Sequence, residues 1–327
     1  MNILVSGGAG FIGSHIVDEL VRDNKVVVLD NLSGGFVKNI NEKAIFIKGS
    51  ILDIELLKAT FQEHKFDYVF HLAAYAAEGL SHFIKRFNYE NNLIGSINLI
   101  NESILNKVKC FVFTSSLAVY GSNQVPMRED MIPFPEDPYG IAKLAVEREL
   151  KVSKDMFDLD YIIFRPHSVY GEKQNIADKY RNVIGIFMNQ IMQNKPMTIF
   201  GDGRQTRAFS YIGDVAPIIA KSIYNHSAYG EVFNIGAERP YSILTLAKVV
   251  AKVMEVEPDI MYLEPRNEVK NAYCDHAKLK RVFGEIKSTS LEEGLVRMAE
   301  WARKIGPKES KFMDIEIKQN LPKGWIE

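Results

Sequence analysis

The segment Gly7-Gly8-Ala9-Gly10-Phe11-Ile12-Gly13 constrains the fold of this chain more than any other part of the sequence. It follows the apolar run Ile3–Val5 and leads into a helix that we expect to begin near Ser14. The spacing of its glycines suits a tight turn, a close approach of the backbone to a pyrophosphate, and close packing of a helix on a strand. The pyrophosphate would then lie at a helix N-terminus, where free N–H groups and the helix dipole favour negative charge. The segment therefore predicts a dinucleotide-binding unit, and a purely structural turn is the alternative.

An acidic residue ends the second apolar run at a position that suits such a unit. Asp30 follows Val26–Leu29 and lies seventeen positions after Gly13. A carboxylate there would accept hydrogen bonds from both hydroxyls of an adenosine ribose and would repel a 2′-phosphate. NAD is therefore the expected cofactor, in preference to NADP.

Short apolar runs alternate with helical stretches through the first half of the chain. The runs are continuous rather than interrupted by polar residues, which is typical of strands buried on both faces of a parallel sheet. We therefore expect an α/β protein with a Rossmann-type doubly wound parallel sheet. The expected strands are Ile3–Val5, Val26–Leu29, Ala44–Ile47, Tyr68–His71, Phe111–Thr114 and Tyr161–Phe164.

The alternation weakens after about Gly171, where short strands, turns and helices mix. We expect residues 1–170 to form the NAD-binding domain and residues 171–327 to form a smaller C-terminal substrate-binding domain. Val232–Ile235 is typical of a strand, so a return strand near residues 231–236 is expected to rejoin the first sheet. The polar stretch Lys308–Glu327 is expected to trail over the surface.

Composition argues against several classes of protein. The chain has 327 residues, 46% of them hydrophobic and 25% charged, and its formal net charge is -1. Lysines and acids are interspersed without the basic stripe that nucleic-acid binding normally needs. No apolar run approaches the roughly 20 residues of a membrane span, and no export signal is expected. Cys110 and Cys274 have no Cys or His neighbour at metal-ligand spacing, so we expect no metal site and a cytoplasmic protein.

Three residues, one after a predicted strand and two on a later helix, suit acid–base chemistry. Ser116 follows Phe111–Thr114, at the sheet edge where ligands bind in open parallel sheets. Tyr139 and Lys143 are four positions apart, so they share one face of a helix that continues through Leu150. A free tyrosine has a pKa of about 10, and a neighbouring ammonium and a nicotinamide cation would lower this pKa, making Tyr139 a general base. A solvated helix face and a turn-forming serine are the alternatives.

With these residues in place, the sequence resembles the extended short-chain dehydrogenases/reductases, and among them the nucleotide-sugar epimerases of the UDP-glucose 4-epimerase type. The resemblance runs nearly from end to end. The segments that carry it are Gly7–Gly13, His71–Ala74, Tyr89–Asn92, Val119–Gly121, Thr198–Gly203 and Arg207–Ile212.

The resemblance implies a role for each matching position. Ser116, Tyr139 and Lys143 would be the catalytic residues. The implied NAD-binding residues are Gly7, Gly10, Phe11, Ile12, Gly13, Asp30, Asn31, Ser33, Gly34, Ser50, Ile51, Leu72, Ala73, Ala74, Asn92, Thr114, Tyr139 and Lys143. The implied UDP-sugar-binding residues are Ser116, Ser168, Asn182, Thr198, Phe200, Arg207 and Arg266. The two arginines suit a diphosphate because guanidinium groups form charge-assisted hydrogen bonds with phosphate oxygens.

The resemblance also implies the reaction. Tyr139 would take the proton of the 4-hydroxyl while C4 passes a hydride to NAD, and the 4-keto sugar would turn before the hydride returns to its other face. Related dehydratases and decarboxylases need an acid in the two positions after the serine, and GDP-sugar epimerases use a cysteine there. Leu117 and Ala118 supply neither, which leaves chemistry at C4 alone.

Four positions depart from the family pattern. Ser50 replaces an aspartate near the adenine, Ala76 replaces a lysine that hexose epimerases often carry, and Ala208 replaces an aspartate. Ser168 stands where UDP-glucose epimerases usually have asparagine and UDP-glucuronate epimerases tend to have a small hydroxyl residue. Interconversion of UDP-glucose and UDP-galactose is therefore the first expectation, and UDP-glucuronate 4-epimerisation is the close alternative. A nucleotide-sugar 4-reductase or dehydrogenase and a non-catalytic NAD-binding module rank below them.

The family further implies a homodimer, in which the helices near Asn91–Leu105 and Tyr139–Leu150 pair with their copies. Apolar side chains on the first helix suit such an interface, and packing in the core explains them equally well. These residues are Leu93, Ile97, Ile100 and Ile104. A UDP-sugar is the expected small-molecule partner, and no nucleic-acid or membrane partner is expected.

Overall fold

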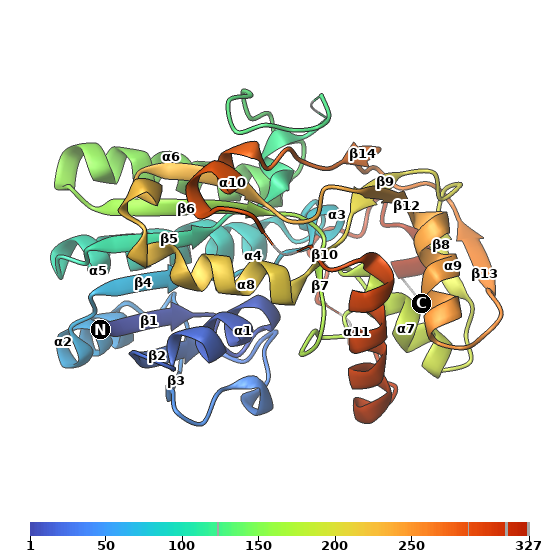
Figure 1. The fold of residues 1–327 in the computed structure, drawn as a ribbon, viewed down its shortest axis with the longest axis horizontal. Coiled ribbons are helices and arrows are strands. Elements are labelled where there is room, and N and C mark those ends of the chain that lie inside the picture. The colour runs from blue at the N-terminus through green and yellow to red at the C-terminus, as the bar shows by residue number, and fades with distance from the viewer. Residues whose placement is uncertain (123, 287, 311–312, 326–327) are drawn as a thin grey trace.

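A computed structural model describes residues 1–122, 124–286, 288–310 and 313–325. Within these residues, the centre is a seven-stranded sheet in which every neighbouring pair is parallel (Figure 1). The sheet strands are β1 (Asn2–Ser6), β2 (Lys25–Asp30), β3 (Ile45–Lys48), β4 (Tyr68–His71), β5 (Cys110–Thr114), β6 (Asp160–Pro166) and β11 (Glu231–Ile235). Their order is β11-β6-β5-β4-β1-β2-β3, so the chain winds outward in one direction from β1 and then in the other from β4. The predicted Rossmann-type doubly wound sheet is confirmed.

Helices cover both faces of this sheet. One face is covered by α1 (Phe11–Leu20) and α8 (Ile212–Lys221), and the other by α2 (Ile54–His64), α5 (Gly95–Leu105) and α6 (Pro138–Phe157). Alternate strand residues point to opposite faces, so Ile3 and Val5 join the first apolar layer and Leu4 joins the second. Among the helices that the structure describes, none is long and apolar enough to cross a membrane.

A capped N-terminus fixes the start of α6, which carries the predicted acid–base pair. The Asp137 carboxylate accepts a hydrogen bond from the Gly140 N–H at 2.8 Å. Pro138 opens the helix, where its missing N–H costs nothing. Tyr139 is therefore the second residue of the helix. Before α5 the chain forms α3 (Glu78–Ser81), α4 (Lys85–Tyr89) and a π-helical turn (Glu90–Ile94), and a 3-10 turn (Leu117–Tyr120) follows β5.

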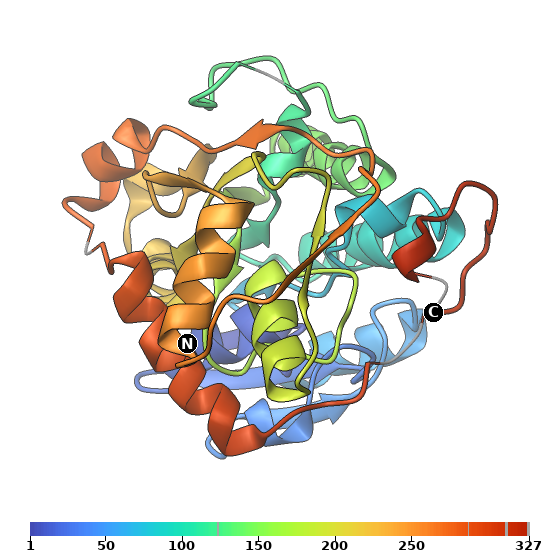
Figure 2. The same ribbon diagram turned by 90° about the vertical axis from the view of Figure 1, so that its right-hand side faces the viewer.

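The second half of the chain forms a smaller region beyond the carboxyl ends of the sheet strands (Figures 1 and 2). Its elements are β7 (Val169–Tyr170), α7 (Val183–Met192), β8 (Met197–Phe200), β9 (Thr206–Ala208), β10 (Ser210–Tyr211), β12 (Pro240–Ser242), α9 (Ile243–Val253), β13 (Ile260–Leu263), β14 (Asn271–Ala272) and α11 (Leu291–Ile305). Helix α10 (Ala277–Phe283) lies apart from these elements and packs against β11 of the main sheet. Helices α7, α9 and α11 pack together, and β8 pairs with β13, β9 with β12 and β14, and β7 with β10. The strand β11, by contrast, pairs with β6 at the edge of the main sheet. A domain boundary near residue 170 stays a prediction.

The C-terminal segment does not simply trail over the surface, as its polar composition suggested. Trp325 is buried, and its indole packs edge-on against the rings of Phe83, Tyr180 and Phe200. The Glu316 carboxylate accepts hydrogen bonds from two backbone N–H groups of α4, at 2.8 and 2.9 Å. Burying one large aromatic ring outweighs the polar residues around it, because aromatic side chains remove the most apolar surface from water.

Candidate active site

A cavity of about 460 Å³ lies at the carboxyl ends of the central strands, where they face the smaller region. The loops after β1, β2, β4 and β5 contribute to its wall, together with residues of α7, β8, β9 and the loop before β14. In a doubly wound sheet, ligands bind at this edge, near the point where the strand order reverses. The cavity wall contains every predicted site residue except Ser50 and Asn92.

The glycine-rich turn fits a pyrophosphate for two separate reasons. A Cβ added to Gly7, whose φ is +76°, would lie 2.5 Å from the Ala73 nitrogen, and one added to Gly13 would lie 2.2 Å from the Gly7 carbonyl oxygen. The fold itself therefore requires these two glycines. A Cβ at Gly10 would meet only the Gly7 carbonyl oxygen, at 3.1 Å, so this residue leaves space in the cavity. The N-terminus of α1 opens there, and its free N–H groups suit an anion.

Asp30 ends β2 and lines the cavity. One of its carboxylate oxygens accepts the Ala9 N–H at 3.0 Å, and the other accepts the Leu32 N–H at 2.7 Å. Burial raises the pKa of Asp30, and the hydrogen bonds from these backbone N–H groups oppose that change. The Gly10 N–H contributes a third backbone hydrogen bond, and a carboxylate has about four acceptor positions, so at least one remains for a ribose hydroxyl. Other predicted cofactor residues in the cavity wall are Asn31, Ser33, Gly34 and Ile51.

Two predicted cofactor residues contact backbone rather than the cavity. The Ser50 hydroxyl accepts the Leu52 N–H at 3.1 Å. The fully buried Asn92 side chain accepts the Tyr75 N–H at 2.9 Å and donates to the Tyr75 carbonyl at 3.1 Å. Asn92 therefore holds the loop after β4, whose residues Leu72, Ala73 and Ala74 line the cavity. A direct contact of Ser50 or Asn92 with the cofactor stays a prediction.

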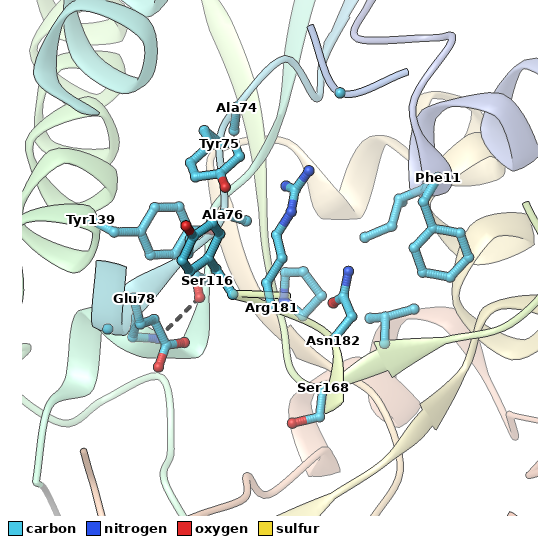
Figure 3. A pocket seen from close by; sticks show the side chains of 18 of the residues that line it. Phe11, Ala74, Tyr75, Ala76, Glu78, Ser116, Tyr139, Ser168, Arg181 and Asn182 are labelled. Atoms are coloured by element: carbon cyan, nitrogen blue, oxygen red, sulfur yellow. Dashed lines mark hydrogen bonds between the residues drawn. The ribbon is translucent and has the colours of Figure 1, made fainter. Parts of the chain in front are cut away.

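Ser116, Tyr139 and Lys143 come together beyond the end of β5. Figure 3 shows the Ser116 and Tyr139 side chains pointing into the same part of the cavity. The Lys143 ammonium nitrogen donates to the Thr114 carbonyl at 2.8 Å and lies 4.6 Å from the centroid of the Phe113 ring. The same nitrogen is 5.8 Å from the centroid of the Tyr139 ring. The spacing of four on α6 thus brings the predicted pair to one wall.

The pKa of Tyr139 is raised in the folded chain, and Lys143 is not among the groups that lower it, which corrects the expectation for Lys143. Burial raises the pKa of Tyr139, and the negative charge of Glu78 raises it further, while a hydrogen bond with Ser116 opposes both. Burial also lowers the pKa of Lys143 to about 7, against the attraction of Glu147. At neutral pH, Lys143 is therefore protonated only part of the time and carries less positive charge than an exposed lysine. We also expect the nicotinamide cation to lower the pKa of Tyr139. This cation is part of the bound cofactor, so the chain alone does not test its effect.

Arg207 and Arg266, the predicted phosphate ligands, converge on the carboxylate of Glu268. One oxygen of Glu268 lies 3.0 Å from a terminal nitrogen of Arg266 and 3.6 Å from one of Arg207. The Arg266 guanidinium also lies 4.7 Å from the ring centroid of Phe200. An anionic oxygen is thus already held between the two cations, as a diphosphate oxygen would be. The other predicted substrate residues, Ser168, Asn182 and Thr198, line the same cavity.

Several polar atoms of the cavity wall have no hydrogen-bond partner in the part of the chain that the structure describes. They include Thr114 Oγ1, both amide atoms of Gln174 and Arg266 Nε. Most buried polar atoms in proteins are paired, so unpaired atoms around one cavity indicate where a ligand supplies the partners. These atoms lie both beside the predicted catalytic residues and at the predicted diphosphate site.

Comparison with known proteins agrees with this geometry. The model of the NAD dependent epimerase/dehydratase family matches residues 3–236. The chain belongs to this family. It is 35% identical to a putative UDP-glucose 4-epimerase of Methanocaldococcus jannaschii, over 92% of this chain and 98% of that protein.

Two solved structures of epimerases are also similar. The UDP-glucose 4-epimerase of Thermotoga maritima with UDP-glucose has a TM-score of 0.89 and 38% identity, covering 93% of this chain and 99% of that chain. The UDP-glucuronic acid 4-epimerase of Bacillus cereus, in complex with UDP-glucuronic acid and NAD, has a TM-score of 0.86 and 30% identity, covering 93% of this chain and 100% of that chain. The predicted family is therefore confirmed.

Membership of this NAD-dependent family also confirms the predicted cofactor, and the cavity fits it. The space left at Gly10 and the N-terminus of α1 suit a pyrophosphate. The spare acceptor capacity of Asp30 suits a ribose hydroxyl, and the unpaired Thr114 hydroxyl lies near Lys143, where a ligand would meet the catalytic residues.

Two charged residues of the cavity wall carry no motif in the sequence (Figure 3). Arg181 donates to the Asp178 carboxylate at 2.7 Å, and its guanidinium lies 4.6 Å from the ring centroid of Tyr75. Nothing in its local sequence distinguishes it from a surface arginine. Glu78 interrupts the small and apolar residues of Ala73–Leu80, and an acid inside such a segment is a signal that identifies a candidate site residue.

Proposed function

We propose that this protein is an NAD-dependent UDP-sugar 4-epimerase that interconverts UDP-glucose and UDP-galactose through a 4-keto sugar. The observation that carries the proposal is the placement of Ser116 and Tyr139 in one cavity wall with Leu117 and Ala118. The two residues after Ser116 are apolar, so they offer neither an acid nor a thiol for chemistry beside C4. The relatives named UDP-glucose 4-epimerase support the same reaction.

Different residues of the chain have different roles in this reaction. The Tyr139 hydroxyl would exchange the proton of the sugar 4-oxygen, and the Ser116 hydroxyl would hold that oxygen in place. Lys143, anchored on the Thr114 carbonyl, fixes the face of α6 that carries Tyr139. NAD, when bound, supplies the acceptance and return of a hydride.

The nucleotide end of the substrate has its own binding groups. Arg207 and Arg266 would bind the diphosphate in place of the Glu268 carboxylate, through charge-assisted hydrogen bonds. A sugar held mainly by its diphosphate is free to turn about the bond that joins the two. Such turning is what an epimerase needs in order to present both faces of C4 to one redox group.

The proposal is tested with purified protein and UDP-glucose, without added cofactor. We expect UDP-galactose to appear, and the same final ratio to be reached from either sugar, with no net oxidation or reduction. Anion-exchange chromatography and proton NMR measure both. Failure to interconvert any UDP-sugar overturns the proposal, and a stoichiometric redox change would identify a reductase or dehydrogenase instead.

UDP-glucuronate 4-epimerisation is the second candidate. It is favoured by the half-buried Ser168 in the cavity wall and by the similarity to the Bacillus cereus enzyme. Incubation with UDP-glucuronate under the same conditions decides between the candidates, because the preferred substrate has the higher kcat/KM.

We also propose a homodimer formed through α5 and α6. Of the residues first considered for this interface, Ile100 is buried in the core, and Leu93, Ile97 and Ile104 pack against it. Other apolar residues on or beside these helices are exposed: Ile94, Leu105, Ile141, Val152 and Met156. Light scattering should give twice the mass of the chain, and a monomer mass at micromolar concentration would contradict the proposal. A cytoplasmic location stays a prediction.

A further inference from the structure

Glu78 is the first residue of α3, and its side chain points into the cavity close to Ser116 and Tyr139 (Figure 3). The Ser81 hydroxyl fixes this arrangement. It donates to the Glu78 carbonyl at 2.6 Å and accepts the Tyr139 N–H at 3.2 Å. One side chain therefore joins the backbones of Glu78 and the proposed base, and the position of Glu78 relative to the reacting oxygen is set by the fold.

The Glu78 carboxylate has no hydrogen bond or ion pair with any residue that the structure describes. The two arginines that influence it most, Arg207 and Arg266, contact Glu268 instead. The surrounding protein and the negative charge of Asp137 raise the pKa of Glu78 to about 7, and the arginines oppose this. The carboxylate is nevertheless open to the cavity. An acceptor of this kind is satisfied by donors that a ligand brings.

We propose that Glu78 is a specificity-determining residue, which accepts hydrogen bonds from hydroxyl groups of the hexose and excludes sugars that carry a carboxylate. This inference rests on the proposed 4-epimerase function and narrows its substrate to UDP-hexoses without an acidic group. A hexose offers several hydroxyl donors around its ring, so a carboxylate can accept hydrogen bonds from different hydroxyls in the two orientations of the sugar. With the diphosphate on Arg207 and Arg266 and the 4-oxygen at Tyr139, the sugar ring lies within reach of Glu78.

A uronate would bring a further negative charge into an already acidic part of the cavity. Asp137 lines the cavity as well, and burial raises its pKa to about 6. Like charges in a partly desolvated site repel, and such repulsion discriminates strongly between ligands. Ser168 in the cavity wall is uncharged, so it does not neutralise the negative charge that a uronate would bring.

The test compares the parent protein with Glu78→Gln, which keeps the shape of the side chain and removes its charge. We measure kcat and KM for UDP-glucose and for UDP-glucuronate. The parent should prefer UDP-glucose, and the variant should lower the ratio of the two kcat/KM values by roughly tenfold to hundredfold, the worth of a charge-assisted hydrogen bond. Most of the change in kcat/KM for each sugar should come from a change in KM rather than in kcat. Glu90→Gln is the matched control, because Glu90 is exposed and lies outside the cavity wall, and its ratio should equal that of the parent.

Each other outcome overturns the inference. An unchanged ratio in a folded Glu78→Gln variant, or a parent that prefers UDP-glucuronate, shows that Glu78 does not select the sugar. A fall in kcat with unchanged KM assigns Glu78 to proton transfer instead of recognition. Thermal melting establishes that the variant is folded.

A failure of the proposed function is distinguishable from a failure of this inference. If the parent epimerises neither sugar, the 4-epimerase proposal fails, and calorimetric Kd values for the two UDP-sugars then test Glu78 directly. The inference predicts tighter binding of UDP-glucose than of UDP-glucuronate, with a smaller difference in Glu78→Gln. The same Kd ratio in parent and variant overturns it.

Discussion

The two ends of the cavity are built in different ways. The cofactor end is made mostly of backbone close together in sequence, the turn Gly7–Gly13 and the end of β2, and both carboxylate oxygens of Asp30 already accept backbone N–H groups. The substrate end is made of side chains that are far apart in sequence, such as Glu78 and Arg266. There, Arg266 Nε lacks a partner among the described residues, and so does the Glu78 carboxylate.

This difference separates two kinds of function. Backbone that is fixed by the fold is ready for its ligand before binding, so changes at the cofactor end should affect folding and cofactor retention. Side chains that lack partners depend on the ligand, so changes at the substrate end should affect recognition while the fold survives. Tyr139 lies where the two ends meet, and changes there should affect the chemistry alone.

The largest effect is expected from Tyr139→Phe. Removal of the hydroxyl should lower kcat by roughly 10²–10⁴-fold, the usual contribution of general acid–base catalysis. Binding of UDP, measured by calorimetry, should be nearly unchanged because the ring remains. Tyr89→Phe is the control, since Tyr89 lies outside the cavity wall. Activity of Tyr139→Phe equal to that of the parent would place the proton transfer elsewhere.

Two alanine substitutions in the glycine-rich turn should separate folding from cofactor binding. In Gly13→Ala the new Cβ would meet a backbone carbonyl at 2.2 Å, so the melting temperature should fall steeply or folded protein should be lost. In Gly10→Ala the nearest atom is 3.1 Å away, so the protein should fold but retain much less NAD on purification. Melting curves and the cofactor content of purified protein check both. An equal fall in melting temperature in the two variants would contradict the separate roles of Gly13 in folding and Gly10 in cofactor binding.

At the substrate end, Arg266→Ala should raise KM for UDP-glucose by roughly tenfold to hundredfold, because a hydrogen bond to a charged group is worth about 1.5–3 kcal/mol. NAD retention and melting temperature should stay near the parent values. Arg204→Ala is the matched control, because Arg204 is largely exposed and lies outside the cavity wall. A loss of NAD in Arg266→Ala would show that the two ends are not independent.

The smallest effect concerns the pH dependence of stability at Lys143. Its pKa is lowered by burial from 10.5 to about 7 in the folded protein, so between these values the unfolded chain binds more protons. The free energy of unfolding therefore rises with pH between about 7 and 10.5 as far as Lys143 is concerned, and this gain is lost as the pH falls toward 7. The difference in free energy of unfolding between the parent and Lys143→Met should grow in favour of the parent by about 1 kcal/mol from pH 7 to pH 8.

Denaturant titrations at the two pH values measure this difference. Lys151→Met, an exposed change on the same helix, is the control and should show no such growth. A parent-minus-variant difference for Lys143→Met that is constant with pH would mean that Lys143 stays charged in the folded protein.

The sheet and the cofactor end were predictable from the sequence because their signals are local. The turn Gly7–Gly13, the terminal Asp30 and the spacing of Tyr139 and Lys143 are each contained in a few neighbouring residues, and their geometry follows from the period of a helix or a strand. Resemblance to a family then supplied the more distant substrate residues, which line the cavity although no local pattern indicates them.

The rest depended on long-range packing that no local pattern encodes. The placement of Glu78 beside Tyr139 requires the contact between α3 and α6 that Ser81 bridges. The raised pKa of Tyr139 in the chain without cofactor could not be predicted, because the burial of Tyr139 and the proximity of Glu78 depend on the fold. The burial of Trp325 in a polar tail likewise depends on aromatic partners from distant segments.

The most direct test of C4 chemistry uses UDP-glucose that carries deuterium at C4. The purified protein is incubated with this sugar in ordinary water, and the UDP-galactose formed is examined by NMR. A redox step confined to one cavity predicts that the product keeps its deuterium at C4, because the hydrogen leaves and returns without exchange with water. UDP-galactose with hydrogen from water at C4, or no UDP-galactose at all, would contradict it.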